Sequence, residues 1–492
     1  MRILLAASEA FPFCKTGGLA DVIGTLSQKL GAAGHDVVLF LPKYRSIEAG
    51  ALQGGMAYPL DIPLGAGCVQ VWLRYMQWRS VSVQFIDCPP LFDREGLYGV
   101  DGRDHPDNDV RYAVFSRAVL EGAKAMGFKP DIVHLHDWQT ALGAVYLKTI
   151  YRRDPFFSGT ASVLTVHNIA YQGSFPAQSL VNVGFKRRQF LSAQVDAPCR
   201  ARDASGRYSF LKAGLIHADW LTTVSPAYAR EVQTAERGLG LETVLRRRRS
   251  RLQGILNGID LDYWNPQKDS LLPCRFSIRD LGGKLACKKK FLADLGLRGG
   301  ASLPLVGMVA RLDRQKGWDM AMAVLGSRLG RCRFSALGEG APALVAAVTK
   351  WAARHPGAAR YLNGYHENVA HRLYAASDIL LMPSRFEPCG LGQMIAMRYG
   401  CVPVVTRTGG LADTVRESEP QSNGFVAEPG DARDLGRTLD RALAAYQTAA
   451  WRDLMRAGME GDFSWDLSVR RYVELYGRAV QKRRSAPKAA GS

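Results

Sequence analysis

Short runs of apolar, often β-branched residues alternate with longer, helix-length stretches along most of the chain. Runs of this kind, flanked by turn formers or polar residues, are typical of buried parallel strands that are joined by helices. The runs occupy residues 3–6, 37–41, 81–86, 132–135, 163–166 and 221–224 in the first half, and 305–309, 333–337, 379–382 and 402–405 in the second. The pattern predicts an α/β protein of two doubly wound domains, with functional residues at the carboxyl ends of the strands.

We expect the joint between the two domains near residues 256–266, because LNGIDLDYWNP contains turn-forming Asn-Gly and Trp-Asn-Pro sequences. Near the end of the chain, apolar residues recur at helical spacing, at Trp465, Val469, Tyr472, Val473, Tyr476 and Val480. The predicted domains are therefore residues 1–256 and 257–462, followed by a closing helix over 463–483 and a disordered basic tail over 484–492.

Composition narrows the class of protein. The 492 residues are 47% hydrophobic and 22% charged, which excludes a disordered scaffold. The formal net charge of +19 favours an anionic partner without choosing one. The 9 cysteines are scattered and form no CxxC pair, so a zinc site or disulfide framework is not expected. With Glu9 interrupting any signal-peptide core and no run of membrane-spanning length, we expect a cytoplasmic protein that is not bound to a membrane.

The segment KTGGLADV, residues 15–22, is the first candidate site. Gly17 and Gly18 lie between a strand and a helix, where a ligand can approach the backbone closely, and the helix N-terminus and Lys15 favour a phosphate. The spacing of its glycines matches neither GxGxxG nor the P-loop. The alternative is therefore a plain strand-to-helix turn with a solvated lysine. TGGLADTV at residues 408–415 repeats the segment, which is consistent with two related α/β units.

Two histidine segments follow predicted strands of the first domain. HLHDWQT contains His134, His136 and Asp137, and TVHNIAYQG contains His167 and Asn168. A metal site is not expected here, because no third ligand follows at suitable spacing. For His134 a structural role is favoured, whereas for His167 and Asn168 a polar contact in a cleft and a buried structural role stay equally open.

In the second domain, Arg311 and Lys316 follow the predicted strand at residues 305–309. The guanidinium fork of an arginine and the point charge of a lysine together suit a diphosphate. Asp313 and Arg314 lie between the two, so an ordinary surface ion-pair cluster is the alternative.

SRFEPCGLGQM, residues 384–394, connects the predicted strand at 379–382 to a helix. Glu387 in this loop could bind sugar hydroxyls or stabilise a developing cation, while the amides of Gly390 and Leu391 could hold an anion. The alternative for Glu387 is a helix-capping carboxylate. Elsewhere, the arginine run at residues 246–251 carries no aromatic interleaving, so a solvated loop is favoured and no nucleic-acid partner is expected.

The ordered segments resemble the bacterial glycogen synthase and plant starch synthase family. They are KTGGLADV, HDWQT, TVHNIAYQG, SFLKAGLIHAD, TTVSPAYARE, GILNGID, ARLDRQKGWD, NGYHE, PSRFEPCGLGQM, RTGGLADTV and DFSW. The resemblance implies a GT-B fold, in which two Rossmann-like domains face each other across a cleft and the last helix crosses back onto the first domain. It also implies transfer of glucose, with retention of configuration and without a metal or other cofactor, from ADP-glucose to the non-reducing end of an α-1,4-glucan such as glycogen.

By this resemblance, Lys15 and the amides of Gly17 and Gly18 contact the donor diphosphate from the first domain. Arg311 and Lys316 hold it from the second domain and stabilise the leaving nucleotide.

The resemblance further implies that Glu387 contacts the donor sugar and that His167, with Asn168, lines the reacting glucose. The remaining matching positions are Asp137, Asn257 and Tyr365 in the cleft, and Gly390 and Leu391 at a helix start. Gly392 stands where the family often has Thr or Ser, so a hydroxyl that could bind the phosphate is missing.

Three other functions stay open at this point. One is a GT-B glycosyltransferase that uses UDP-glucose or a small acceptor. Another is a nonenzymatic glucan- or nucleotide-binding protein, which the joint presence of Lys15, His167, Arg311, Lys316 and Glu387 argues against. Glucan phosphorylase shares the architecture, but no segment matches its pyridoxal-phosphate lysine site.

Covalent attack by Glu387 and attack by the acceptor from the leaving-group face are both compatible with the sequence.

Overall fold

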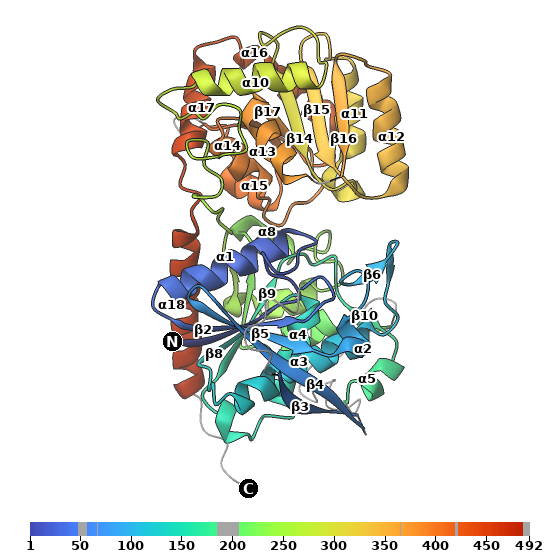
Figure 1. Ribbon diagram of the computed structural model, residues 1–492, viewed down its shortest axis with the longest axis vertical. Coiled ribbons are helices and arrows are strands. Elements are labelled where there is room, and N and C mark those ends of the chain that lie inside the picture. Colours follow the sequence, from blue (N-terminus) through green and yellow to red (C-terminus); the bar gives the residue numbers. More distant parts are fainter. Residues whose placement is uncertain (48–56, 66, 185–205, 365, 419–421, 486–492) are drawn as a thin grey trace. The chain divides into compact units, whose positions relative to one another are not determined.

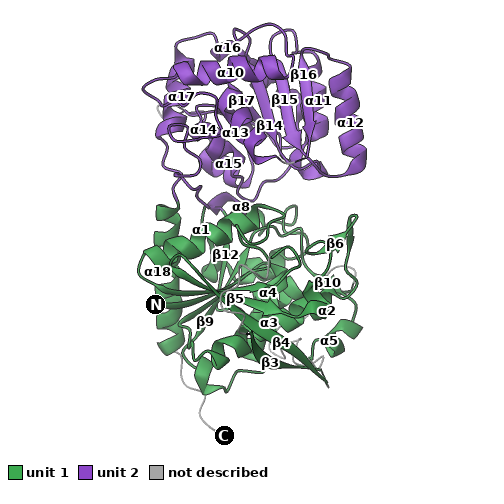
Figure 2. Cartoon of the chain, viewed as in Figure 1, with its two compact units in different colours: residues 1–224, 229–256, 465–492 green, residues 225–228, 257–464 purple. Residues whose placement is uncertain are grey.

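The computed structural model describes residues 1–47, 57–65, 67–184, 206–364, 366–418 and 422–485 (Figure 1). The chain divides into two compact units (Figure 2). Unit 1 comprises Met1–Val224, Ala229–Leu256 and Trp465–Ser492, and unit 2 comprises Ser225–Tyr228 and Asn257–Ser464. The C-terminal segment is thus grouped with the first part of the chain.

Unit 1 is built on a nine-stranded sheet in the order β13-β12-β9-β8-β1-β2-β5-β4-β3. Its parallel strands are β1 (Arg2–Ala6), β2 (Asp36–Pro42), β5 (Val81–Asp87), β8 (Ile132–His136), β9 (Ala161–Val166), β12 (Trp220–Thr223) and β13 (Leu252–Gly254). The six strands predicted for the first half are confirmed, since each apolar run coincides with one of these strands, except that Val224 follows the end of β12.

The sequence predicted neither edge of this sheet, because none of the apolar runs falls on β13 and the opposite edge was missed as well. There β3 (Ala57–Leu64) and β4 (Gly67–Trp78) pair antiparallel with each other, and β4 pairs antiparallel with β5. In β4 the buried Val71 and Leu73 alternate with more exposed residues. A strand with one solvated face has no continuous apolar run, so the pattern of apolar runs does not predict β4. Two short antiparallel pairs complete the strands in the described part of this unit: β6 (Gly99–Val100) with β7 (Arg103–Asp104), and β10 (Ser174–Phe175) with β11 (Tyr208–Ser209).

Helices flank the sheet of unit 1 (Figure 1). They are α1 (Gly18–Ala32), α2 (Pro89–Phe92), α3 (Asn108–Ala125), α4 (Trp138–Lys148), α5 (Gln178–Asn182), α7 (Phe210–His217), α9 (Glu242–Arg247) and α18 (Trp465–Ser485), with 3-10 turns at Pro155–Phe157 and Arg249–Arg251. Helix α8 (Pro226–Glu231) has residues in both units. In the described residues, no helix combines the length and the apolar character needed to cross a membrane.

Helix α18 packs within unit 1. Tyr476 is buried, and its hydroxyl lies 2.7 Å from Nδ1 of His134 on β8. At its far end Arg484 pairs with Asp131 at 2.8 Å, and the helix continues to Ser485. It therefore includes the first two residues of the predicted tail, while residues 486–492 lie outside the described part of the chain.

The arginine run is not a loop, because it falls in α9 and a 3-10 turn. Arg246, Arg247 and Arg249 are exposed, as a solvated segment requires. Arg248 is half-buried, and its guanidinium donates hydrogen bonds to the carbonyl oxygens of Leu215 (2.8 Å), Ile216 (2.6 Å) and Ala218 (2.5 Å). These carbonyls end helix α7 and have no intrahelical donor, so the arginine satisfies them. Its role here is structural.

Unit 2 is built on a six-stranded parallel sheet in the order β16-β15-β14-β17-β18-β19. The strands are β14 (Leu305–Val309), β15 (Arg333–Gly338), β16 (Ala359–Asn363), β17 (Ile379–Met382), β18 (Val402–Thr406) and β19 (Phe425–Ala427). The four strands predicted for the second half are confirmed. Among the strands in the described part of this unit, the edge strands β16 and β19 were missed, since β16 is half-exposed and β19 is three residues long.

The strand order of unit 2 is that of a Rossmann fold, in which the first strand, β14, lies beside the fourth, β17. The chain reverses its direction of winding at this pair, and ligands of such sheets bind outside the carboxyl ends of the strands there. Helices flank this sheet as well: α10 (Gly282–Asp294), α11 (Trp318–Gly326), α12 (Pro342–Ala353), α13 (Glu367–Ala376), α14 (Gly392–Arg398), α15 (Gly409–Thr414), α16 (Ala432–Ala445) and α17 (Ala450–Glu460).

Candidate functional site

The candidate residues of unit 1 lie at the carboxyl ends of three adjacent strands. The segment with Lys15, Gly17 and Gly18 follows β1, Asp137 follows β8, and His167 with Asn168 follows β9. Strand β1 pairs with β8, and β8 pairs with β9, so the three loops leave the same edge of the sheet. The backbone N–H of His167 donates to Oδ1 of Asp137 at 2.7 Å. The topology therefore brings the predicted residues of this unit together.

Space, rather than backbone conformation, explains the paired glycines at the start of α1. Gly17 has φ −156° and ψ −168°, an extended conformation that any residue adopts. A Cβ atom added to Gly17 or Gly18 would have no atom of the described chain within 4 Å. In contrast, a Cβ on Gly24 in the same helix would lie 2.4 Å from the carbonyl oxygen of Phe11. Gly17 and Gly18 thus leave open space beside a helix N-terminus, where an anion can approach.

Two carboxylates already interact with this Gly-rich loop. Lys15 Nζ lies 2.7 Å from Oδ1 of Asp21, and both side chains are partly exposed. Glu9, which is only 3% exposed, accepts hydrogen bonds from the backbone N–H groups of Thr16 at 2.5 Å and Gly17 at 3.2 Å. The contacts of Glu9 with this loop were not predicted from the sequence. The signal it offered was an acid three residues after a buried apolar strand.

Asp137 connects two of the loops. It has φ 58°, which is uncommon for a residue other than glycine, and its side chain accepts the backbone N–H groups of His167 and Asn168. Burial raises the pKa of its carboxyl to about 7, although those two hydrogen bonds oppose the shift. Asp137 therefore holds the segment after β9 in place.

Three histidines lie close together at the same strand ends, where His134 and His136 are buried and His167 is half-buried. The rings of His134 and His136 lie 4.0 Å apart, and Nδ1 of His136 lies 3.0 Å from Nε2 of His167. Burial lowers the pKa values of His134 and His167 to about 3, so both rings are neutral at physiological pH. Because Nε2 of His167 faces His136, a ligand would be contacted through Nδ1. Among the described residues, no group of three or more His, Cys, Asp or Glu side chains is arranged to hold a metal ion.

In unit 2 the central feature is an ion pair between the ends of β14 and β17. Lys316 Nζ lies 2.5 Å from Oε2 of Glu387, and the hydroxyl of Ser384 donates to the same oxygen at 3.0 Å. The two charged side chains are only 17% and 7% exposed. Glu387 is therefore held by a cation and a hydroxyl, and it does not act as the cap of α14, whose N-cap has no side-chain hydrogen bond.

Several contacts hold the two loops that carry this pair. The side-chain amide of Gln315 donates to the carbonyl oxygen of Phe386 at 3.0 Å, and Arg385 N donates to the carbonyl oxygen of Gln315 at 2.8 Å. The Arg385 guanidinium also donates twice to the carboxylate of Asp319, at 2.9 and 2.7 Å. Gly317 has φ 68°, and a Cβ there would lie 2.0 Å from the carbonyl oxygen of Pro383. Only glycine therefore fits this turn.

The second TGGLAD segment supports the Glu387 loop instead of opening to solvent. A Cβ on Gly409 would lie 1.9 Å from the carbonyl oxygen of Glu387, and one on Gly410 would lie 2.0 Å from that of Cys389. The Gly410 N–H also donates to the carbonyl oxygen of Glu387 at 3.1 Å. The two copies of the segment therefore have different roles: the first leaves space, and the second packs against the loop that carries the acid.

The remaining candidates of unit 2 lie around these loops. The guanidinium of Arg311 is half-exposed and lies 3.5 Å from the carboxylate of Asp313. This contact is the one expected if Arg311 belongs to a surface ion-pair cluster. Asn257 is buried and hydrogen-bonds to Cys389, whose thiol pKa burial raises to about 12, so the thiol is not reactive. Leu391 is the N-cap of α14. Tyr365 lies outside the described residues.

Gly390 and Gly392 have distinct surroundings. Gly390 has φ 69°, a conformation that favours glycine, and a Cβ there would meet Oε1 of Gln393 at 2.4 Å. A Cβ on Gly392 would lie 3.2 Å from the hydroxyl oxygen of Tyr374. A threonine or serine at 392 would therefore require Tyr374 to shift.

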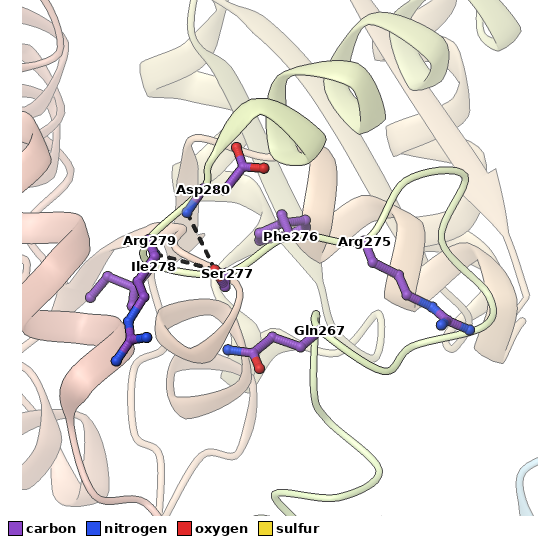
Figure 3. Close-up of a pocket in the computed structure, with 7 residues that line it drawn as sticks. All are labelled: Gln267, Arg275, Phe276, Ser277, Ile278, Arg279 and Asp280. Carbon is purple, nitrogen blue, oxygen red and sulfur yellow. Dashed lines mark hydrogen bonds between the residues drawn. The ribbon is translucent and has the colours of Figure 1, made fainter.

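Unit 2 also contains a surface hollow of about 680 Å³ ahead of α10 (Figure 3). Its lining residues are Gln267, Arg275, Phe276, Ser277, Ile278, Arg279 and Asp280. Arg275 and Arg279 are exposed, and none of the residues predicted to be functional lines this hollow.

Comparisons with known proteins cover both units. Residues 2–247 match the family "Starch synthase catalytic domain", and residues 303–445 match "Glycosyl transferases group 1". The chain is 43% identical over 489 residues to the glycogen synthase of Elusimicrobium minutum, covering 98% of this chain and 100% of that one. It is 43% identical over 491 residues to the glycogen synthase of Syntrophotalea carbinolica, covering 98% and 99%.

Solved structures show the same similarity. The catalytic domain of starch synthase IV from Arabidopsis thaliana, bound to ADP and acarbose, matches with a TM-score of 0.89 and 35% identity, covering 97% of this chain and 99% of that one. Sucrose-phosphate synthase from Thermosynechococcus elongatus matches with a TM-score of 0.61 and 19% identity, covering 98% and 99%, which shows a shared fold.

The different roles of the two TGGLAD segments predict different effects of the same substitution. Gly410→Ala should lower the free energy of unfolding by about 1–3 kcal/mol, because its Cβ overlaps a backbone carbonyl that cannot move freely. Gly18→Ala should leave it nearly unchanged, because the added methyl group meets open space. Urea denaturation followed by circular dichroism measures both. Equal destabilisation of the two variants would contradict the assigned roles.

Asp137 predicts a pH dependence of stability. In the folded protein its pKa of about 7 lies above the ordinary value of 3.8, so protonation of Asp137 stabilises the folded state. This stabilisation is fully present below about pH 4 and is lost as the pH rises through 7. The melting temperature of the wild type minus that of Asp137→Asn should therefore decrease between pH 4 and pH 8. Subtracting the two melting temperatures removes the pH dependence that other titrating groups cause in both proteins. A difference that stays constant with pH would contradict the raised pKa of Asp137.

Proposed function

This chain belongs to the bacterial glycogen synthase and plant starch synthase family, and from that premise we propose that it transfers glucose from ADP-glucose to the non-reducing end of an α-1,4-glucan, with retention of configuration, to elongate glycogen. The observation that carries the proposal is its 43% identity, over almost its whole length, to proteins named glycogen synthase. The neighbouring starch synthase structure was solved with ADP bound, which supports an adenine nucleotide as part of the donor.

The first requirement of this reaction is stabilisation of the departing ADP. Negative charge grows on the diphosphate as the bond to glucose breaks, and fixed cations lower the barrier most when they are in place beforehand. Lys316 and Arg311 lie at the end of β14, beside the point where the direction of winding reverses. In the proposed role, the ammonium of Lys316 and the guanidinium of Arg311 bind the phosphate oxygens.

The second requirement is stabilisation of the glucose carbon that loses its bond. Positive charge develops there, and a nearby carboxylate favours it electrostatically. Glu387 is the proposed group, because its carboxylate is held in one position by Lys316 and Ser384. Cys389, two residues further on, has a raised thiol pKa and is not assigned a chemical role.

Unit 1 supplies groups that suit a phosphate and a sugar. The open backbone at Gly17 and Gly18, with Lys15, suits a phosphate oxygen. His167 is a neutral ring that can hydrogen-bond to a glucose hydroxyl without adding charge, and Asp137 positions its backbone. Asn168 Oδ1 accepts the Ala170 N–H at 3.0 Å, so its side-chain amide group is oriented. We assign these residues to the donor glucose and its diphosphate.

We further propose that the enzyme acts in the cytoplasm. The cysteines in the described part of the chain are free, at Cys14, Cys68, Cys88, Cys274, Cys287, Cys332, Cys389 and Cys401. Unpaired cysteines in this number suit a reducing compartment. Fractionation of cells that produce the protein, with glucosyl transfer as the readout, tests this assignment.

A transfer assay tests the reaction and the role of Lys316 together. Wild-type protein should add radiolabelled glucose from ADP-glucose to a glycogen primer, more efficiently than from UDP-glucose, and EDTA should not abolish the transfer. Lys316→Ala should lower kcat by about tenfold to a thousandfold, if one such donor contributes about 1.4–4 kcal/mol to the transition state. Lys289→Ala, which removes an exposed lysine of α10, is the control and should leave kcat unchanged.

Each result bears on a different part of the proposal. If glucose is transferred neither from ADP-glucose nor from UDP-glucose, the proposed reaction is contradicted. Preference for UDP-glucose would contradict the assigned donor. Near-normal kcat in a folded Lys316→Ala variant would show that the leaving diphosphate does not depend on this lysine.

A further inference from the structure

Glu9 is a buried acid that the proposed reaction does not use. It is 3% exposed, and its carboxylate accepts four hydrogen bonds. Oε2 accepts the backbone N–H groups of Thr16 at 2.5 Å and Gly17 at 3.2 Å, and Oε1 accepts the hydroxyls of Thr16 at 2.8 Å and Tyr98 at 2.5 Å. A carboxylate so near a loop assigned to a phosphate is unexpected, because like charges repel.

The hydrogen-bond partners of Glu9 explain how an acid and a phosphate can share this loop. Gly17 is the N-cap of α1, so the amides of Thr16 and Gly17 precede the first helical residue. The amides of the first helical turn, which starts at Gly18, are the ones that lack intrahelical acceptors. Glu9 thus accepts hydrogen bonds from the two amides that precede the helix and from none in its first turn. The open space beside Gly17 and Gly18 is left unobstructed.

Glu9 is itself held in place. The hydroxyl of Tyr98 bridges Glu9 and Ser8, with the Ser8 hydroxyl 2.8 Å from the Tyr98 hydroxyl. The negative charge of Glu9 is also one of the causes that raise the pKa of Asp137, so the acid is electrostatically coupled to the end of β8. Hydrogen bonds to an ionised acceptor are about twice as strong as neutral ones. The carboxylate therefore fixes the loop more firmly than a neutral group would.

We propose that Glu9 is the positioning residue of the Gly-rich loop, and that it holds the backbone of residues 16–18 in the conformation that receives a phosphate of the nucleotide-sugar donor. The inference rests on the proposed function, because it assigns the donor phosphate to this loop. Glu9 acts through the backbone of Thr16 and Gly17, and it is not assigned a contact with the substrate.

The test compares two substitutions of Glu9. Glu9→Gln keeps one side-chain oxygen that can accept both backbone N–H groups, and the hydroxyls of Thr16 and Tyr98 can turn to accept from its amide. Glu9→Ala removes every contact. We expect Glu9→Ala to raise the KM for ADP-glucose and the Kd for ADP by about tenfold or more, with little change in the KM for glycogen, and Glu9→Gln to restore most of the loss.

Glu121→Gln is the matched control. Glu121 on α3 accepts the hydroxyl of Tyr151 at 2.5 Å, so this variant also removes a carboxylate that is bonded to a tyrosine. It should leave the KM for ADP-glucose and the Kd for ADP unchanged. Calorimetry with ADP gives the Kd, and initial rates at varied donor and varied glycogen give the two KM values.

The outcomes separate the inference from the function on which it rests. If the wild type neither transfers glucose nor binds ADP, the proposed function fails. If the wild type is active and a folded Glu9→Ala keeps the wild-type donor KM and Kd, the positioning role is overturned, whatever its melting temperature. Should Glu9→Ala not fold, Tyr98→Phe decides, because it removes the hydroxyl that holds Oε1 of Glu9: a higher donor KM and a higher Kd for ADP are expected, and wild-type values overturn the proposal.

Discussion

The pairing of Lys316 with Glu387 is the interaction on which the organisation of the candidate site in unit 2 depends. Two opposite charges lie 2.5 Å apart and largely out of solvent, on loops that follow adjacent strands. Removing such charges from water costs free energy that is recovered only when the geometry is held closely. The loops therefore need firm support, and the turn at Gly317 and the packing of Gly409 against the Glu387 carbonyl provide it. The result is a cation and an acid that are placed before any substrate binds.

The two TGGLAD segments show how one sequence serves two purposes. Near the start of the chain the glycines border open space, and at residues 408–415 they are packed against backbone carbonyls. What differs is the neighbouring chain. The first segment donates a backbone hydrogen bond to the carboxylate of Glu9, and the second packs against the loop that carries Glu387. An internal repeat therefore indicates related local structure without indicating a shared role.

Local pattern was sufficient for the core of both sheets and insufficient for their edges. Strands such as β14 and β17 are continuous apolar runs because both of their faces are covered, so their bounds were predicted correctly. Strands β4 and β16 have exposed positions, which interrupt the run. The candidate residues at strand ends could be predicted because the doubly wound arrangement brings those ends together. Contacts across long sequence separations could not, such as those of Arg248 with the end of α7 and of Glu9 with Tyr98.

The most direct measurement of the central claim is a crystal structure of the wild-type protein with ADP bound. If Lys316 stabilises the leaving group, its Nζ should lie about 2.7–3.2 Å from a phosphate oxygen of ADP. An ADP molecule whose phosphates contact neither Lys316 nor Arg311, with the lysine still paired only to Glu387, would contradict the account.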